Sequence, residues 1–462
     1  MKSSKVMAAL VTLGLAAAVA TPAMALENQF SGSFTSFYDL SNYSATGNFG
    51  GTSNAEGLAK NAKTENYFVQ RVRLGYTAKA SDDVKLVTKF EFDYNYWGNS
   101  SYTVGRGTGG ALGADSVNME TKNLYLDLNF PKIVNAKIGM QGYNDAFKGI
   151  IFDADMAGIL LAHEYDKAGV SAGFFRFGDR ALSTIGKNTH DMFSLDGKYS
   201  VTKEVKVGAA YYYISDNRDN GSTTTPSALA IGQTADGTPI YATTTTFVTT
   251  ANPKNDTKVH TFGLNAEAAV GPLTLTGFAL AQLGDYDAAT KAKGYAFNVG
   301  AKMPLAGGIA RSEFLYAAGG KNALYVPASA GGTEGGGFYD AEMTILNRNK
   351  YATSIDNALV YDSNNFNQGL IMGSLGYDYT ITPKLSGSVN AGFAAVAKDN
   401  AALGSHKTNY LGTEVNCETN YKIMPTVTLG ARAGYVFLGD YFKSSPTLDN
   451  PYDVKLIAKF AF

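Results

Sequence analysis

Cysteine and histidine are scarce in this sequence, and their scarcity excludes several kinds of site. Cys417 is the one cysteine among 462 residues, so an intramolecular disulfide, a cysteine-rich zinc site and a Cys-x-x-Cys-His haem attachment are excluded. The four histidines have no metal-ligand spacing, and we expect neither a metal nor another cofactor. His190 and Asp191 form the one pair that could belong to a catalytic site. No nucleophile accompanies them, so we do not expect an enzyme.

Excess charge and long apolar runs are also missing. Lys and Arg number 39 against 40 Asp and Glu, a balance that offers no basic surface to nucleic acid. Beyond residue 25, no run approaches the roughly 18 consecutive apolar residues of a membrane-spanning helix. The chain is instead rich in glycine, tyrosine and phenylalanine, with 51, 29 and 26 residues. This composition favours strands and turns over helices.

The first 25 residues indicate export. Lys2 and Lys5 precede an apolar run over residues 6–20, and Ala23-Met24-Ala25 follows it. A basic start, a short apolar stretch and an A-x-A site form a cleavable secretory signal. We therefore expect residues 1–25 to be removed and residues 26–462 to form a single domain. Because the apolar run is shorter than a spanning helix requires, an uncleaved anchor is the less favoured alternative.

Apolar and polar residues alternate in segments of about ten residues. Between Lys85 and Trp97, one parity holds Leu86, Thr88, Phe90, Phe92, Tyr94 and Tyr96, and the other holds Lys85, Lys89, Glu91, Asp93 and Asn95. A period of two indicates a β-strand with one apolar and one charged face. Similar segments occur at 66–80, 294–303, 426–437 and 452–462. About ten residues are enough for a tilted strand to cross a bilayer.

The connections between these segments alternate in length. Short connections rich in turn residues occur at 81–83, 131, 166–169, 202–204, 271–272, 304–307, 382–384 and 424–425. Long connections occur at 44–64, 98–118, 144–157, 178–190, 215–257, 284–293, 319–367, 398–407 and 438–451. One rim of short turns and one rim of long loops is typical of an antiparallel meander barrel that spans a membrane. The count predicts an all-β transmembrane barrel of about 18 strands, with 16 as the alternative.

Aromatic residues predict which face meets lipid. They gather near the long connections at Tyr94, Tyr96, Tyr211, Tyr213, Tyr295 and Phe437, and near the short turns at Phe130, Tyr199, Tyr379, Tyr421 and Phe462. Two aromatic girdles fit the two interfaces of a membrane, whereas a soluble β-sandwich, the competing fold, does not require them. The apolar parity, which includes Cys417, is therefore expected to face lipid. The charged parity then faces a lumen, which must hold water because buried unpaired charge is costly.

The export signal, the meander pattern and the final strand YDVKLIAKFAF resemble the outer-membrane porins of Gram-negative bacteria over the whole mature chain. The resemblance implies a location among the lipids of the outer membrane and passive diffusion of ions and small hydrophilic solutes. It also implies a homotrimer, whereas the absence of a nucleic-acid partner follows from the charge balance. Phe460 and Phe462, on the terminal strand, would be the signal that the barrel-assembly machinery reads.

Porins commonly fold their third long loop into the barrel as a constriction. The third long segment of this chain, YNDAFKGIIFDADMAG, carries Asp145, Asp153 and Asp155 together with Lys148. Its apolar residues suit a loop that packs against the barrel wall. The resemblance therefore implies an inward-folded third loop with an acidic face.

Basic residues on the early strands would face that loop across the lumen, by the same resemblance. They are Arg71, Arg73 and Lys89. Opposed charges across a narrow aqueous gap create a transverse field that orients polar solutes and sets ion preference. The alternative is that these residues are ordinary lumen wall, paired with neighbours such as Glu91 and Asp93.

Two functional classes remain open on the sequence. The first is a passive channel. The second is a structural or interaction barrel, either a surface scaffold or a sheath for an electron-carrying partner, with the long loops 215–257 and 319–367 as binding elements. The inward aromatics Tyr125, Tyr143 and Tyr212 are interpreted as filler, with a sugar-stacking track as the alternative.

Overall fold

A computed structural model describes most of the chain beyond residue 25. The described residues are 26–43, 57–98, 110–112, 119–179, 186, 188–218, 222–233, 239–251, 255–287, 290–327, 339, 341–347, 358–360, 362–443 and 447–462. For 93–95, 222–233 and 239–251, only the backbone is described. The predicted export signal, residues 1–25, lies outside these ranges.

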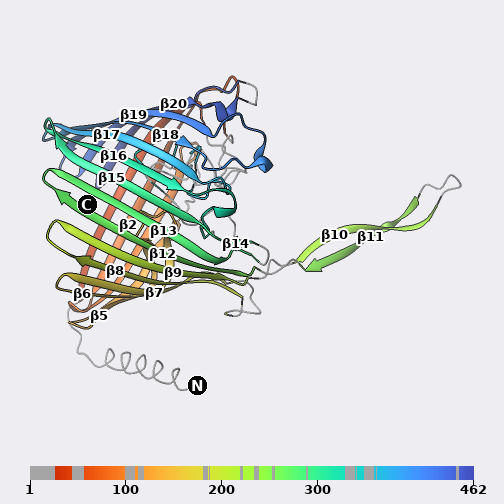
Figure 1. Ribbon diagram of the computed structural model, residues 1–462, viewed down its shortest axis with the longest axis horizontal. Coiled ribbons are helices and arrows are strands. Elements are labelled where there is room, and N and C mark those ends of the chain that lie inside the picture. The colour runs from red at the N-terminus through yellow and green to blue at the C-terminus, as the bar shows by residue number, and fades with distance from the viewer. Residues whose placement is uncertain are drawn as a thin grey trace, which may run out of the picture.

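The described residues form a closed antiparallel barrel of 18 strands (Figure 1). The strands of the barrel are β1 (Glu27–Ser41), β2 (Glu65–Lys79), β3 (Val84–Tyr96), β4 (Met119–Phe130), β5 (Val134–Asn144), β6 (Asp153–Tyr165), β7 (Ala168–Asp179), β8 (Thr189–Ser200), β9 (Val205–Asp216), β12 (Thr257–Val270), β13 (Leu273–Asp285), β15 (Tyr295–Leu305), β16 (Gly308–Ala317), β17 (Leu370–Thr382), β18 (Leu385–Ala395), β19 (Tyr410–Met424), β20 (Val427–Leu438) and β21 (Tyr452–Ala461). Consecutive strands pair along the sheet, and β1 also pairs with β21. This last pairing removes the free edges of the sheet. The predicted fold class and strand number are confirmed.

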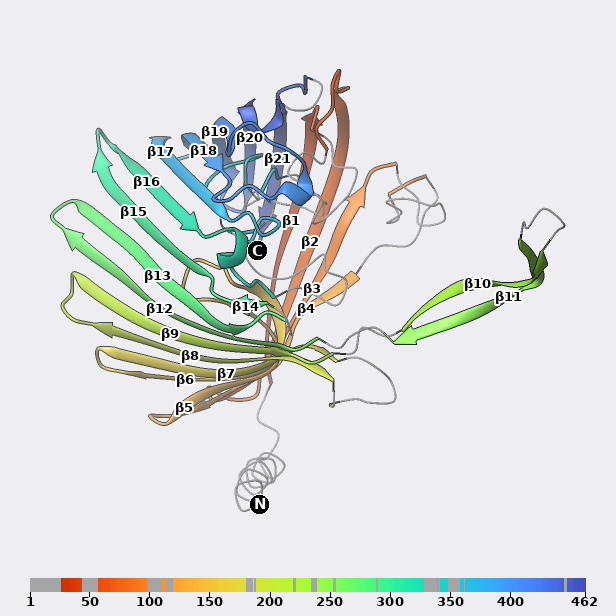
Figure 2. The ribbon, with the colours of Figure 1, turned by 45° about the vertical axis from the view of Figure 1, so that its right-hand side comes forward.

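Smaller elements of secondary structure lie in the long loops. The two-residue strand β14 (Lys291–Ala292) pairs with β13, and three 3₁₀ turns lie at Gly320–Asn322, Ala401–Leu403 and Asp440–Phe442. Strands β10 (Ser222–Gln233) and β11 (Pro239–Ala251) form a separate two-stranded sheet. Figure 2 shows this hairpin projecting away from the barrel. Among the described residues, no helix is long and apolar enough to cross a membrane.

The eight short connections lie where the turn residues predicted them. One example is the β2–β3 turn after Lys79, and another is the β19–β20 turn after Met424. The chain ends on the same rim, because the backbone N–H and C=O of Phe462 both bond to Gly32 near the start of β1, at 3.0 Å each. Both termini of the barrel therefore lie on the short-turn rim, as expected.

The two faces of the strands differ as the alternation predicts. Leu86 is exposed on the outer wall, whereas Glu91 on the same strand is buried inside. Cys417 is exposed on the outer face beside Val415. The short-turn girdle is exposed throughout, at Phe130, Tyr199, Tyr379, Tyr421 and Phe462.

The predicted position of Tyr96 in the outer girdle is wrong. Tyr96 is 3% exposed and packs inside the barrel with Phe37 and Val69, whereas Trp97 is 53% exposed. A bulge in the β2–β3 pairing, between Gln70 and Val72, adds a residue to β3 and reverses its parity. Trp97 therefore takes the outward position, where it stacks on Phe68 with ring centroids 4.6 Å apart.

Candidate functional site

The third loop, residues 145–152 between β5 and β6, folds into the barrel. Its residues Phe147, Ile150 and Ile151 are completely buried. The Phe147 ring lies 5.6 Å from that of Phe278 on β13 and 6.0 Å from that of Tyr212 on β9, centroid to centroid. The loop therefore covers the inner faces of these strands, which confirms the inward third loop.

Asp145 shapes this loop from within and does not present its carboxylate to an open gap, contrary to the prediction. The side chain is buried, with 5% of the residue exposed. Its two carboxylate oxygens accept hydrogen bonds from the backbone N–H groups of Phe147, Gly149, Ile151 and Phe152, at 2.7, 3.0, 2.6 and 2.9 Å. Buried backbone donors require such partners. Asp145 is thus a structural acceptor that organises the turn.

The other two predicted loop acids belong to a strand. Asp153 and Asp155 lie at the start of β6, because the loop ends at residue 152, five residues before the end of the predicted connection 144–157. The Asp155 carboxylate pairs with Lys122 on β4, with Nζ and Oδ2 at 2.8 Å. Gly142 of β5 lies opposite Asp155 in the sheet.

The predicted basic residues gather around one buried carboxylate. Arg71 and Arg73 on β2 both pair with Glu91 on β3, and the Nε of Arg71 lies 3.6 Å from Oε2. Lys122 Nζ lies 3.4 Å from Oε1 of the same carboxylate. Both arginines therefore pair with Glu91 in the wall, as the alternative interpretation of the sequence predicted, and do not face the loop acids across a gap. The side chain of Asp93 lies outside the described residues.

Lys89 completes this group, which we name the charge cluster: Arg71, Arg73, Lys89, Glu91, Lys122 and Asp155. Lys89 is half-buried on β3 and lies within electrostatic range of Arg73 and Lys122. The cluster thus holds four basic side chains beside the carboxylates of Glu91 and Asp155, and Glu120 of β4 lies opposite Glu91 in the sheet. Like charges held together in a wall require water or counter-ions beside them. The basic side chains are partly exposed to the interior.

Lys122 is a member of the cluster that the alternation pattern missed. It shares the parity of Leu124 and Leu126, which face outward. A register shift in the β3–β4 pairing, between Lys89 and Phe90, turns Lys122 toward Glu91. The sequence did contain a sign of this, because Lys122 is a charged residue on the otherwise apolar parity of its strand.

A second segment also enters the barrel. It comprises Tyr339 and residues 341–347, and we name it the inner segment. Three consecutive N–H groups, those of Thr344, Ile345 and Leu346, donate to the carboxylate of Glu414 on β19 at 2.6, 2.9 and 2.8 Å. Glu414 is completely buried. The described part of the long loop 319–367 thus packs against the inner wall, a point that the sequence left open.

Replacing Glu414 with glutamine should loosen the inner segment. The amide NH₂ removes the acceptor from at least one of the three N–H groups, which costs roughly 1–3 kcal/mol for each buried donor left unpaired. We expect amide hydrogen exchange at Thr344, Ile345 and Leu346 to accelerate about tenfold or more. Glu418→Gln on the same strand is the control, because Glu418 bonds its own neighbour Asn420 at 2.7 Å. Unchanged exchange in Glu414→Gln would contradict this role.

The inward tyrosines support the third loop. Asp196 accepts hydrogen bonds from Tyr143 at 2.5 Å and from Tyr212 at 2.6 Å. The Tyr212 hydroxyl also accepts a bond from the N–H of Ala146 at 2.8 Å. Since Tyr212 is completely buried, its ring offers no face to a sugar. These contacts favour the filler interpretation.

His190 and Asp191 have separate partners. His190 is buried beside Tyr325, whose hydroxyl lies 3.3 Å from its Nε2. Asp191 instead pairs with Arg176, with Oδ1 and Nε at 2.8 Å. In the described part of the chain, no group of three side chains is placed to hold a metal ion.

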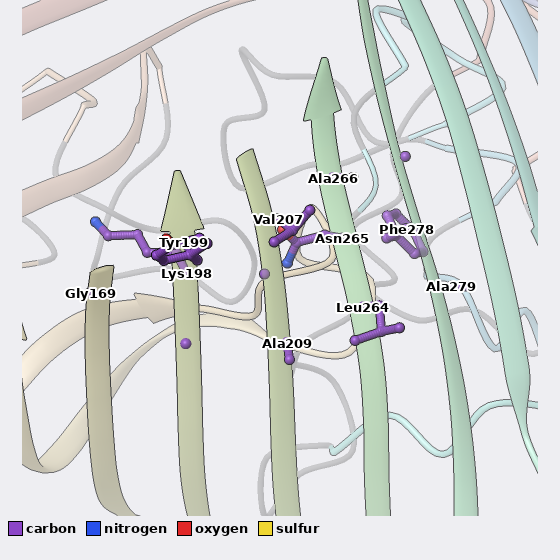
Figure 3. Close-up of a pocket in the computed structure, with 13 residues that line it drawn as sticks. Gly169, Lys198, Tyr199, Val207, Ala209, Leu264, Asn265, Ala266, Phe278 and Ala279 are labelled. Carbon is purple, nitrogen blue, oxygen red and sulfur yellow. The ribbon is translucent and has the colours of Figure 1, made fainter. Parts of the chain in front are cut away.

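A groove of about 660 Å³ runs along the barrel wall over strands β8, β9, β12 and β13 (Figure 3). It opens outward, because its residues Tyr199, Val207 and Leu264 are exposed on the outer face. Asn265, between them, instead points inward and bonds the carbonyl of Ala146 at 3.2 Å. The groove therefore belongs to the outer wall of the barrel.

No protein-family model and no curated protein matches this chain. Solved structures resemble it over most of its length. The crystal structure of Pseudomonas aeruginosa OccK5 (OpdH) has a TM-score of 0.54 at 13% identity, covering 94% of this chain and 98% of that one. For OpdQ of the same organism, the TM-score is 0.53 at 12% identity, with 94% and 99% covered.

The Pseudomonas aeruginosa outer membrane protein opdK gives a similar result, with a TM-score of 0.53 at 10% identity and coverage of 94% and 98%. Identities this low establish the fold alone. The chain therefore has the fold of an outer-membrane porin, with 18 antiparallel strands in a closed barrel.

Proposed function

We propose that this protein is a channel of the bacterial outer membrane for the passive diffusion of ions and small hydrophilic solutes. The observation that carries the proposal is the charge cluster on the inner face of a closed barrel whose outer face is apolar. Arg71, Arg73 and Lys122 keep part of their side chains exposed to the interior. Charge in such a place requires water, and a barrel of about 18 strands is wide enough to hold an aqueous path.

The charge cluster would set a preference for anions. Four basic side chains of the cluster outnumber the carboxylates of Glu91 and Asp155, even when Glu120, opposite Glu91 in the sheet, is added. A local excess of positive charge on a water-filled wall attracts anions and repels cations. Lys148, at the tip of the third loop, pairs with Glu313 on another side of the interior and therefore adds no net charge. The predicted selectivity residues that enter the proposal are Arg71, Arg73, Lys89, Glu91 and Asp155, with Lys122 added. Asp145, Lys148 and Asp153 lie outside the charge cluster, and the side chain of Asp93 lies outside the described residues.

Assembly and location belong to the same proposal. Residues 1–25 would direct export and be cleaved, and copies of the barrel would associate as homotrimers. Phe460 and Phe462 would serve as the assembly signal. The pairing of Phe462 with Gly32 supports this. Phe462 pairs with the first strand when the sheet closes, so its backbone is free for the assembly machinery to bind before closure.

Planar lipid bilayers test the channel directly. The purified protein should insert with stepwise increases in conductance, and a salt gradient should give a reversal potential on the anion-selective side. Arg73→Gln should move that potential toward cation preference. The control is Lys206→Gln near the short-turn rim, where Lys206 pairs with Glu267 at 3.0 Å. Folded barrels that insert without any conductance would overturn the proposal.

A structural or interaction barrel is the second candidate. It is favoured by the β10–β11 hairpin that projects from the loop rim (Figures 1 and 2). The two inward segments, which fill part of the interior, also favour it. Absence of conductance in the bilayer experiment would support this candidate over the channel.

A further inference from the structure

Glu313, on the inner face of β16, receives donors from three separate parts of the barrel. Its Oε1 pairs with Nζ of Lys148 at the tip of the third loop. The same oxygen accepts bonds from Asn298 Nδ2 on β15 at 3.0 Å and from the Tyr339 hydroxyl of the inner segment at 2.8 Å. One carboxylate oxygen therefore joins the wall to both inward segments.

The contact with Lys148 differs from the other contacts of the third loop. The body of that loop is buried, whereas the side chains of Lys148 and Glu313 are 36% and 22% exposed. Lys148 and Gly149 have positive φ angles of 64° and 76°, which turn the tip and direct the lysine away from the loop's own core. The loop thus reaches the solvent-accessible interior through a single cation held by Glu313.

The third loop also contacts the long loop that includes the inner segment, and the inner segment contacts the wall beside Glu313. The Ser363 hydroxyl, in the long loop that includes the inner segment, donates to the carbonyl of Ile150 at 2.6 Å. On the other side, Asn298 Nδ2 bonds the Tyr339 hydroxyl at 3.0 Å. Tyr339 is therefore held at the wall by Asn298 and Glu313, and Glu313 is the group that the tip of the third loop and the inner segment share.

We propose that Glu313 is a positioning residue that holds the third loop and the inner segment in one arrangement, and so fixes the cross-section of the aqueous path and the largest solute that passes. This inference rests on the proposed channel function. Its physical basis is that a charged acceptor shared by a lysine, an amide and a hydroxyl defines one geometry for all three. Without the negative charge of Glu313, the partly exposed Lys148 side chain loses the ion pair that holds it at the wall.

Glu313→Gln tests the inference, with Glu267→Gln as the matched control. Glu267 is also an inner-wall glutamate paired with a lysine, Lys206, but it lies near the short-turn rim and contacts neither inward segment. In Glu313→Gln, amide hydrogen exchange over 146–152 and 341–347 should accelerate at least tenfold, while the strands and the control variant keep wild-type rates. Single-channel recordings should show fluctuating conductance, and liposomes should admit larger neutral sugars.

A charge exchange provides the rescue. The double variant Lys148→Glu with Glu313→Lys restores an ion pair at the same place, so exchange over 146–152 should return toward wild-type values. Because lysine cannot accept the bonds from Asn298 and Tyr339, exchange over 341–347 should stay fast. Wild-type exchange rates in Glu313→Gln would overturn the inference even if the channel conducts. A wild-type protein that does not conduct would overturn the channel function, whereas accelerated exchange in Glu313→Gln would still support the positioning role of this residue.

Discussion

Asp145→Ala releases the third loop from the barrel wall. The substitution removes the acceptor of four backbone N–H groups at once, those of Phe147, Gly149, Ile151 and Phe152. Each buried donor left unpaired costs about 1–3 kcal/mol, so the loop leaves its site and its N–H groups bond to water. A loss of about 3 kcal/mol corresponds to more than 100-fold, which is the expected acceleration of amide exchange over 147–152.

Conductance should rise in the same variant, because the loop then covers less of the interior. The barrel itself should persist, since the strand pairings do not involve Asp145. Asp145→Asn should be intermediate, as it keeps one acceptor oxygen. Asp127→Ala on β4 is the control, because Asp127 accepts one side-chain bond, from Asn135 at 2.7 Å. Wild-type exchange over 147–152 in Asp145→Ala would contradict the structural role assigned to this carboxylate.

Glu91→Gln strengthens the preference for anions. The change removes one of two carboxylates from the charge cluster and leaves four basic side chains in place. Glu91 is buried behind the basic side chains, and a unit charge about 8 Å from a passing ion is worth roughly 0.5 kcal/mol in water, with opposite sign for anions and cations. The ratio of anion to cation permeability should therefore change by about 1 kcal/mol, or about fivefold. The partly exposed side chains of Arg71, Arg73 and Lys122 remain hydrated, so the barrel should still fold.

Reversal potentials in a salt gradient measure this effect. It should be largest at low ionic strength and shrink as salt screens the cluster. Glu267→Gln also removes a glutamate from the inner wall, but outside the cluster, and its shift should be much smaller. Equal shifts in the two variants would show that net charge of the lumen, and not the geometry around Glu91, governs selectivity.

The strand positions, the short turns and the division into two faces follow from local sequence. Leu86 and Glu91 lie on opposite parities of one strand, and the structure places them on opposite sides of the wall. Turn residues end the strands where the chain reverses, as after Lys79 and Met424. These features are readable because side chains alternate along any extended strand, whatever it pairs with.

Pairing between strands decided what alternation alone could not. The bulges that turn Tyr96 inward and bring Lys122 to Glu91 exist only relative to a neighbouring strand. One added residue reverses every side chain beyond it. For this reason, the sequence placed Arg71, Arg73 and Glu91 in one wall but missed Lys122, which joins Glu91 to Asp155.

The sequence by itself determined a meander barrel with a charged interior, because periodicity and turn chemistry are local. Only the tertiary structure decided which acids face the lumen. The porin resemblance places Asp145 at the lumen, and strand parity places Glu414 there. In the structure, each carboxylate instead accepts hydrogen bonds from backbone N–H groups of a segment that folds back inside the barrel. Such donors are generic to every residue and leave no mark in the sequence. Their partners are fixed by how the loops pack, and that packing leaves the charge cluster to face the water.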